Sequence, residues 1–311
     1  MSFPCITRTS RLSEKPWKVD AVARLIASVV VCIMIGAVVG ANINYFGEPE
    51  RKSTALFLGG SVASLVCFGE ALYVLARPWP FEKYLRKLLI LLICIYGGFL
   101  LMWGIARLAG DHSDSQNTTL RVLIAVLSFQ GAALVLVHFF LREHHTSWVE
   151  GFGFNQSPGH ALVTGILVAL LVAVPVTMGL NLSINLLVEW LTAHRPPEQE
   201  AVQIISKTVG WANRLVLAVA TIVVAPVAEE VIFRGILYPA IKRAGYPRWA
   251  LWGTAVLFGL IHLNVGTFVP LTFLAIVLAC LYEYTGNLLA CITVHSLFNA
   301  TNFVALYLLQ K

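Results

Sequence analysis

Charged residues are scarce in this sequence. Only 12% of its 311 residues are Asp, Glu, Lys or Arg, against about 25% in an average soluble domain. Hydrophobic residues make up 58% of the chain, and the mean hydropathy is +0.78. This composition excludes an ordinary soluble domain and predicts a protein that crosses a membrane several times. The net charge of +6 does not indicate nucleic-acid binding, because the basic residues lie in short loops between apolar runs.

Several chemical signatures are also missing. No CxxC pair is present, and five of the six cysteines lie inside apolar runs, so they indicate neither a metal centre nor a disulfide framework. The HExxH motif of many zinc proteases does not occur. No Ser or Cys accompanies a histidine in the pattern of a nucleophile and its base, because Ser296 lies about 100° around the helix from its neighbour His295.

A series of long apolar runs fills most of the chain. An α-helix of about 20 apolar residues crosses the hydrocarbon core and satisfies its own backbone there. We therefore predict an all-α transmembrane bundle of about eight to nine spans, depending on whether the short seventh run crosses on its own. Pro175 is expected to kink the fifth span. The predicted spans are 21–45, 54–76, 84–108, 120–141, 161–191, 211–241, 249–263, 268–284 and 288–309.

Lysine and arginine are distributed unevenly over the predicted loops. With nine spans and a cytoplasmic N-terminus, thirteen of the 22 basic residues lie on the cytoplasmic side, seven lie on the opposite side and two lie within the sixth span. This asymmetry predicts that the N-terminus is cytoplasmic. We expect an integral protein of a bacterial-type inner, or cell, membrane.

Polar residues divide the chain into three parts. Residues 1–145 form apolar spans with few internal polar groups, and we assign them no role. Residues 146–160 are predicted to be an interfacial segment anchored by Trp148, Phe152 and Phe154. Residues 161–311 hold nearly all the polar groups that lie within spans, so the function is expected there.

Two adjacent carboxylates interrupt the sixth predicted span. Glu229 and Glu230 lie in an otherwise apolar run, where a charged side chain costs about 2.5–3.5 kcal/mol at the helix centre. Glu230 and Arg234 are four residues apart, so they share a helix face and can form an ion pair. Glu229 lies about 100° away and has no partner on its own helix. A structural ion pair alone would leave Glu229 unexplained, so we expect a functional site.

Two further motifs with histidine lie on later predicted helices. His262 follows Phe258 by four residues, and His295 precedes Asn299 by four. Taken alone, each histidine is more typical of a packed core residue or of a contact between helices. At about 1.5 Å per residue from the span ends, however, Glu229, His262 and His295 all lie about 13–21 Å deep. We therefore expect the three side chains to meet near the middle of the membrane.

These side chains have a hydrolytic use. A carboxylate that desolvation makes more basic can take a proton from water, which then attacks a peptide carbonyl. A histidine and an amide can stabilise the oxyanion and protonate the leaving amine. Alternatively, Glu229, His262 and His295 could hold a Zn²⁺ ion with an open position. The residues leave both chemistries open and indicate no other cofactor.

In this order and at these separations, the motifs resemble those of the CPBP family of CAAX prenyl endopeptidases and bacteriocin-processing (Abi) enzymes. The resemblance covers about residues 148–310 and leaves residues 1–145 outside. The family signatures EExxxR, FxxxH and HxxxN correspond here to Glu229, Glu230 and Arg234, to Phe258 and His262, and to His295 and Asn299.

The resemblance implies an intramembrane peptidase of the CAAX type, with residues 161–311 as its core. Its partners would be membrane lipid and a membrane-presented or lipid-modified peptide. The resemblance also implies that Glu229 activates water with His262 as its partner, and that His295 and Asn299 lie on the oxyanion side. Glu230 and Arg234 would hold the geometry. Whether the enzyme is a metalloprotease stays open.

Two other classes of function remain as alternatives. A non-catalytic scaffold or bacteriocin-immunity protein of the same fold would keep its cellular phenotype when Glu229 or His262 is replaced. A proton-coupled transporter would use Glu229, Glu230 and the histidines as a relay and would show substrate flux in liposomes. The sequence has no internal repeat, which argues against a transporter.

Overall fold

The computed structural model describes residues 12, 15–46, 54–76, 124, 126–194, 202 and 210–309. Within these residues every regular element is a helix and no strand is present, which confirms the all-α prediction. Six helices in this part of the chain are long and apolar enough to cross a membrane. The predicted span 84–108 lies outside the described residues, so the total of eight or nine spans stays a prediction.

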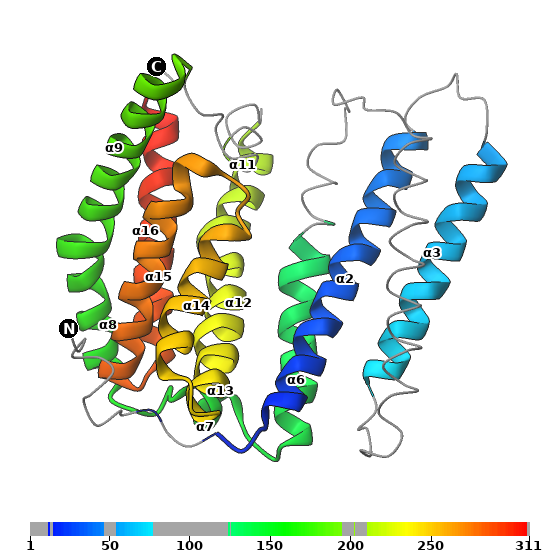
Figure 1. Cartoon of the computed structure of the whole chain (residues 1–311), viewed down its shortest axis with the longest axis horizontal. Coiled ribbons are helices and arrows are strands. Elements are labelled where there is room, and N and C mark those ends of the chain that lie inside the picture. The colour runs from blue at the N-terminus through cyan, green and yellow to red at the C-terminus, as the bar shows by residue number, and fades with distance from the viewer. Residues whose placement is uncertain are drawn as a thin grey trace. The chain divides into compact units, whose positions relative to one another are not determined.

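The chain forms two compact units (Figure 1). The small unit comprises the described residues of Asp20–Phe140. The large unit comprises the described residues up to Val19 together with those from Leu141 onward. The sequence placed the end of the N-terminal part at residue 145, close to this division. The short segment before the first span packs with the large unit, which composition did not indicate.

The small unit holds α2 (Val19–Phe46) apart from its first residue, α3 (Thr54–Leu75), the π-helical turn η2 (Leu127–Gly131) and most of α6 (Ala132–Glu143). One contact between α2 and α3 is polar, because the Asn42 side-chain amide donates to Ser61 Oγ at 2.9 Å. Buried hydrophobic residues of α2 and α3 form one cluster, namely Val31, Val38, Phe57, Phe68, Ala71 and Leu75.

The large unit is a bundle of long, closely packed helices (Figure 1). Within it α14 packs against α15, α15 against α9, and α16 against α8. The turns η4 and η5 and helix α12 also contact α16. The elements are α7 (Trp148–Phe152), α8 (Pro158–Val168), η3 (Ala169–Ala173), α9 (Val174–Thr192), α11 (Trp211–Val219), η4 (Ala220–Val224), α12 (Ala225–Glu230), η5 (Val231–Leu237), α13 (Tyr238–Arg243), α14 (Pro247–Leu260), α15 (Val265–Thr285) and α16 (Leu288–Leu309).

Three π-helical turns of the large unit each end two residues before a proline. The turns η3, η4 and η5 precede Pro175, Pro226 and Pro239 respectively. A proline inside a helix has no N–H, and its ring collides with the carbonyl four residues earlier. In all three cases that carbonyl lies inside the wide turn. The local widening gives the ring space and lets the helix continue. The span that contains Pro175 is therefore one continuous helix, 158–192, with a π turn just before the proline.

The seventh predicted span is a helix, but a short one. Helix α14 has 14 residues, or about 21 Å at 1.5 Å per residue, less than the ~30 Å hydrocarbon core. It ends at Leu260, earlier than the predicted break at 264–267. Leu263 then adopts φ +50°, and the side chain of Asn264 caps α15 by accepting from the Thr267 N–H at 3.1 Å. His262 therefore lies in the turn between two helices.

The interfacial segment is built into the large unit. Ser147 and Glu150 form a capping box at the start of α7, and these hydrogen bonds lower the pKa of the exposed Glu150 carboxyl. Gly153 has φ +72° and approaches Gly286 so closely that an added Cβ would lie 2.0 Å from its carbonyl oxygen. Phe152, predicted as a membrane anchor, is instead fully buried. That part of the prediction is wrong, because Phe152 packs on Gly235.

Candidate active site

The two adjacent glutamates lie at the end of α12, where the helix widens into η5. Both are buried, with Glu229 8% exposed and Glu230 fully covered. The predicted i,i+4 ion pair is present, with Arg234 Nη1 2.7 Å from Glu230 Oε1. Both glutamates lie within the candidate span Asn213–Arg243, well away from both of its ends.

Arg234 is held by more than its carboxylate partner. Its second terminal nitrogen donates to the carbonyl of Ala275 on α15 at 3.3 Å. The guanidinium also lies over the ring of Phe258 on α14, 4.7 Å from its centroid. The wide turn that carries Arg234 thus contacts two neighbouring helices, which fixes the guanidinium and, through it, Glu230.

His295 on α16 connects the two carboxylates. Its Nδ1 lies 2.8 Å from Glu230 Oε1, and its Nε2 lies 3.8 Å from Glu229 Oε2. The first distance is a hydrogen bond, and the second is too long for one. Because Nδ1 donates to Glu230, Nε2 is an acceptor when the ring is neutral and a donor when it is protonated. One imidazole therefore has a nitrogen facing each glutamate.

The sequence did not predict the link between His295 and Glu230. The i,i+4 rule describes neighbours on one helix, and it made Glu230 and Arg234 look like a closed pair. A carboxylate oxygen can accept two hydrogen bonds, however, and Glu230 Oε1 accepts one from each partner. The similar depth of Glu230 and His295 on their two helices was the signal for this bond in the sequence. The prediction from depth, however, named Glu229 and not Glu230.

His262 lies beside this network without joining it directly. Its Nδ1 lies 2.7 Å from the carbonyl oxygen of Phe258, near the end of the preceding helix α14. The Phe258 ring contacts both imidazoles, with centroid distances of 5.0 Å to His262 and 5.7 Å to His295. Among the described residues His262 has no hydrogen bond or ion pair to Glu229. The expected meeting of three groups is therefore direct for Glu229 and His295 and indirect, through Phe258, for His262.

Asn299 ties α16 to the helix that carries the glutamates. Its side-chain amide donates to the carbonyl of Thr221 in η4 at 2.8 Å. In that turn Ala225 N–H bonds the carbonyl five residues earlier, and the next such bond would join residue 226 to Thr221. Residue 226 is a proline without an N–H. Asn299 thus satisfies the carbonyl that Pro226 leaves unpaired, while its second amide hydrogen stays available.

The predicted zinc ligands do not form a zinc-like set in this arrangement. Within the described part of the chain, no group of three or more His, Cys, Asp or Glu residues is placed to hold a metal ion. Both nitrogens of His295 face the carboxylates, and His262 Nδ1 is bonded to a carbonyl. A catalytic zinc needs three protein ligands at about 2 Å. The zinc alternative stays a prediction.

The segment that carries this network matches a known family. Residues 211–301 match the model of the Rce1-like family, described as type II CAAX prenyl endopeptidase Rce1-like. The match includes all three sequence motifs, whereas the small unit and the helices α7–α9 lie outside it. No curated protein and no solved structure is significantly similar to the chain. The predicted resemblance to CAAX proteases is confirmed for this segment.

Proposed function

From the Rce1-like domain at residues 211–301 we infer that the protein is an intramembrane endopeptidase acting on a membrane-presented or lipid-modified peptide. The family is one of proteases, and the match supports a CAAX-type endopeptidase in general. The proposed mechanism is hydrolysis by water that Glu229 activates. The observation that carries it is the placement of His295 between the carboxylates of Glu229 and Glu230.

Glu229 is the group best suited to act as the base. It is buried inside a membrane-spanning helix, and its Oε2 lies 3.8 Å from His295 Nε2. A gap of this length can be bridged by one water molecule. Glu229 would take a proton from that water while the water oxygen bonds to the peptide carbonyl carbon. The proton then passes to the leaving amine as the C–N bond breaks.

Glu230 and Arg234 act as positioning residues in this proposal. Glu230 holds His295 through Nδ1 and so directs Nε2 toward Glu229, as a carboxylate behind a catalytic histidine does. Arg234 compensates the charge of Glu230. Glu229 therefore does not share the Arg234 cation and remains the carboxylate available to water.

His295 and Asn299 lie on the oxyanion side in the same proposal. A protonated Nε2 of His295 can donate to the oxygen that becomes negative when water adds, and Asn299 has one amide hydrogen beyond its bond to Thr221. His262 has its Nε2 left for substrate or product, because Nδ1 is bonded to Phe258. This histidine is the second group that could protonate the leaving amine.

The test is cleavage of a farnesylated CAAX-type peptide by the full-length protein in proteoliposomes. Glu229→Gln keeps the size of the side chain and removes the base, so the cleavage rate should fall by about 10²–10⁴-fold. The matched control is Glu143→Gln, which removes an exposed carboxylate of the large unit and should leave the rate unchanged. Cleavage by Glu229→Gln at the wild-type rate would overturn the proposal that Glu229 activates water, and absence of cleavage by the wild type would favour the scaffold alternative.

A further inference from the structure

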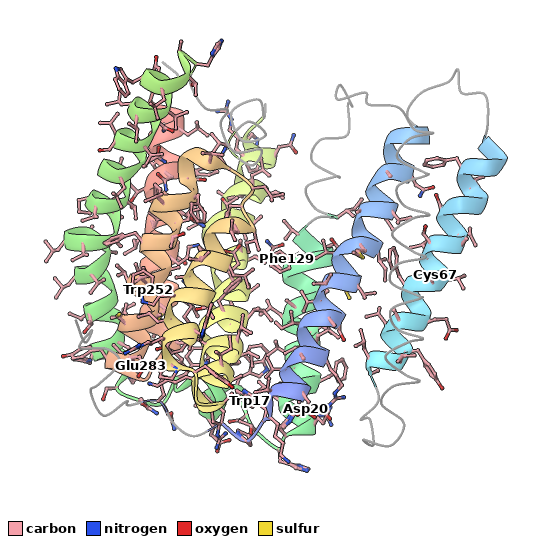
Figure 2. The ribbon with its side chains drawn as sticks, in the orientation of Figure 1. Trp17, Asp20, Cys67, Phe129, Trp252 and Glu283 are labelled. Carbon is pink, nitrogen blue, oxygen red and sulfur yellow. The ribbon has the colours of Figure 1, made fainter. Side chains whose placement is uncertain are left out.

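A basic pocket lies in the large unit at the end where α13 terminates. Its volume is about 380 Å³, and part of its wall is the short segment that precedes the first span. Of the eight lining residues in the described part of the chain, three are cationic and none is acidic. The lining consists of Lys15, Pro16, Trp17, Lys18, Val19, Ala240, Arg243 and Ala244. Figure 2 labels Trp17 at this end of the unit. We call this cavity the basic pocket.

Lys15 forms the fixed inner part of the basic pocket. Its side chain is 5% exposed, and its ammonium donates to the carbonyl of Gly151 and to the hydroxyl of Tyr282, the latter at 3.3 Å. The ammonium also lies 5.8 Å from the centroid of the Trp17 ring. Contacts with α7 and α15 thus hold a positive charge at the pocket wall, whereas Lys18 and Arg243 are exposed at its mouth.

The basic pocket lies where membrane spans end. The candidate span Val19–Asn42 begins at one lining residue, and the candidate span Asn213–Arg243 ends at another. The ends of spans lie at the level of the lipid headgroups, where anionic phosphates are concentrated. Exposed Tyr246 and Trp249 lie three and six residues after the end of α13, and aromatic residues of this kind are typical of the same level.

We propose that the basic pocket binds a phosphate group, either that of an anionic lipid headgroup or free phosphate. Lys18 and Arg243 supply the charge at the mouth, and Lys15 supplies a buried donor at the wall. A bound anion would also favour the charged form of Lys15, whose pKa burial lowers to about 8. Such a site would fix the segment before the first span against the large unit when the protein lies in an anionic membrane.

The experiment measures binding to the purified full-length protein in neutral detergent. The probes are dioctanoyl phosphatidylglycerol, dioctanoyl phosphatidylcholine and inorganic phosphate. The pocket variant is Lys18→Gln with Arg243→Gln. The matched control is Arg142→Gln with Arg248→Gln, which removes two exposed charges of the same unit that do not line the pocket. Lys18→Gln alone replaces the pocket variant if that double variant does not fold.

The expected result is saturable binding of phosphatidylglycerol by the wild type that is weakened by about 25-fold in the pocket variant, because each of the two basic residues removed contributes a factor of about five near an anionic headgroup. The matched control should retain its affinity within about twofold. Phosphatidylglycerol binding without phosphate binding identifies a lipid site, and binding of both identifies a general phosphate site. The proposal is overturned if the wild type binds neither phosphatidylglycerol nor phosphate. It is also overturned if both double variants weaken binding equally, or if phosphatidylcholine binds as tightly as phosphatidylglycerol.

Discussion

Glu230 and Glu283 have similar surroundings, yet we assign them different roles. Glu230 Oε1 accepts from Arg234 at 2.7 Å and from His295 at 2.8 Å. Glu283 Oε1 accepts from Lys242 and, at 2.8 Å, from the Tyr238 hydroxyl. Within the described residues the second oxygen of each carboxylate is buried without a hydrogen-bond partner. A buried ion pair with an unpaired oxygen is therefore not by itself a sign of chemistry.

The two glutamates differ in depth and in what lies beyond them. Glu230 is 13 residues from the end of the span Asn213–Arg243, about 20 Å along the helix. Glu283 is two residues from the end of α15, and Figure 2 labels it toward the same end of the large unit as Trp17. The partners of Glu283 are a tyrosine and a half-buried lysine. The histidine at Glu230 instead lies 3.8 Å from a second carboxylate, that of Glu229. We call Glu229, Glu230 and His295 the deep centre, where we propose the chemistry, and Glu283 with its two partners the shallow centre.

The largest expected effect comes from comparing the residue that donates to Glu230, His295, with the residue that donates to Glu283, Tyr238. His295→Asn keeps a donor near the position of Nδ1, for Glu230, and removes the Nε2 that faces Glu229. Cleavage of the farnesylated peptide should fall by about 10²–10⁴-fold with little loss of stability. Tyr238→Phe removes the corresponding donor of Glu283 and should leave the cleavage rate within about twofold. Equal losses of cleavage in both variants would show that the deep centre has no special role.

The second prediction concerns the stability of the shallow centre. Glu283→Gln leaves Lys242 without its anionic partner and weakens a charge-assisted hydrogen bond, so the free energy of unfolding should fall by about 2 kcal/mol. Denaturant unfolding in mixed micelles measures this change. The cleavage rate of the folded fraction should stay at the wild-type level. A folded Glu283→Gln protein that no longer cleaves would place Glu283 in the chemistry and remove the distinction between the two centres.

A smaller effect is expected at the turn that carries Arg234. A Cβ on Gly235 would lie 2.5 Å from the ring of Phe152, which is itself fully buried. Gly235→Ala should therefore destabilise the protein by about 1–3 kcal/mol and lower the cleavage rate by displacing the turn. Gly253→Ala is the matched control, because its Cβ would make only an ordinary contact at 3.6 Å with Trp249. Thermal unfolding of both variants in the same detergent compares them.

The sequence predicted the parts of the site that depend on one helix. The spacing of Glu230 and Arg234 sets their ion pair, because the helix repeat alone places them on one face. The helical class and most span positions follow from apolar length. The resemblance then identified the segment that the family match covers. The roles proposed for Glu229, His262 and Asn299 stay predictions.

Most of the features that the sequence did not predict depend on packing between helices. The bond from His295 to Glu230 joins residues 65 positions apart, and no local period encodes it. The burial of Phe152 depends on the missing side chain of Gly235 on another helix. Glu283 went unnoticed because it lies near a span end, where a carboxylate is common. The π turns were also missed, although the prolines that they precede are visible in the sequence.

Whether Glu229 activates water can be tested by following the oxygen atom in a single turnover. Excess protein in H₂¹⁸O would cleave the farnesylated peptide once, and mass spectrometry would examine both the product and the peptide containing Glu229. The account predicts ¹⁸O in the new carboxylate of the product and none in Glu229. A first product that lacks ¹⁸O, together with label in Glu229, would show that this carboxylate attacks the substrate itself and would contradict the account.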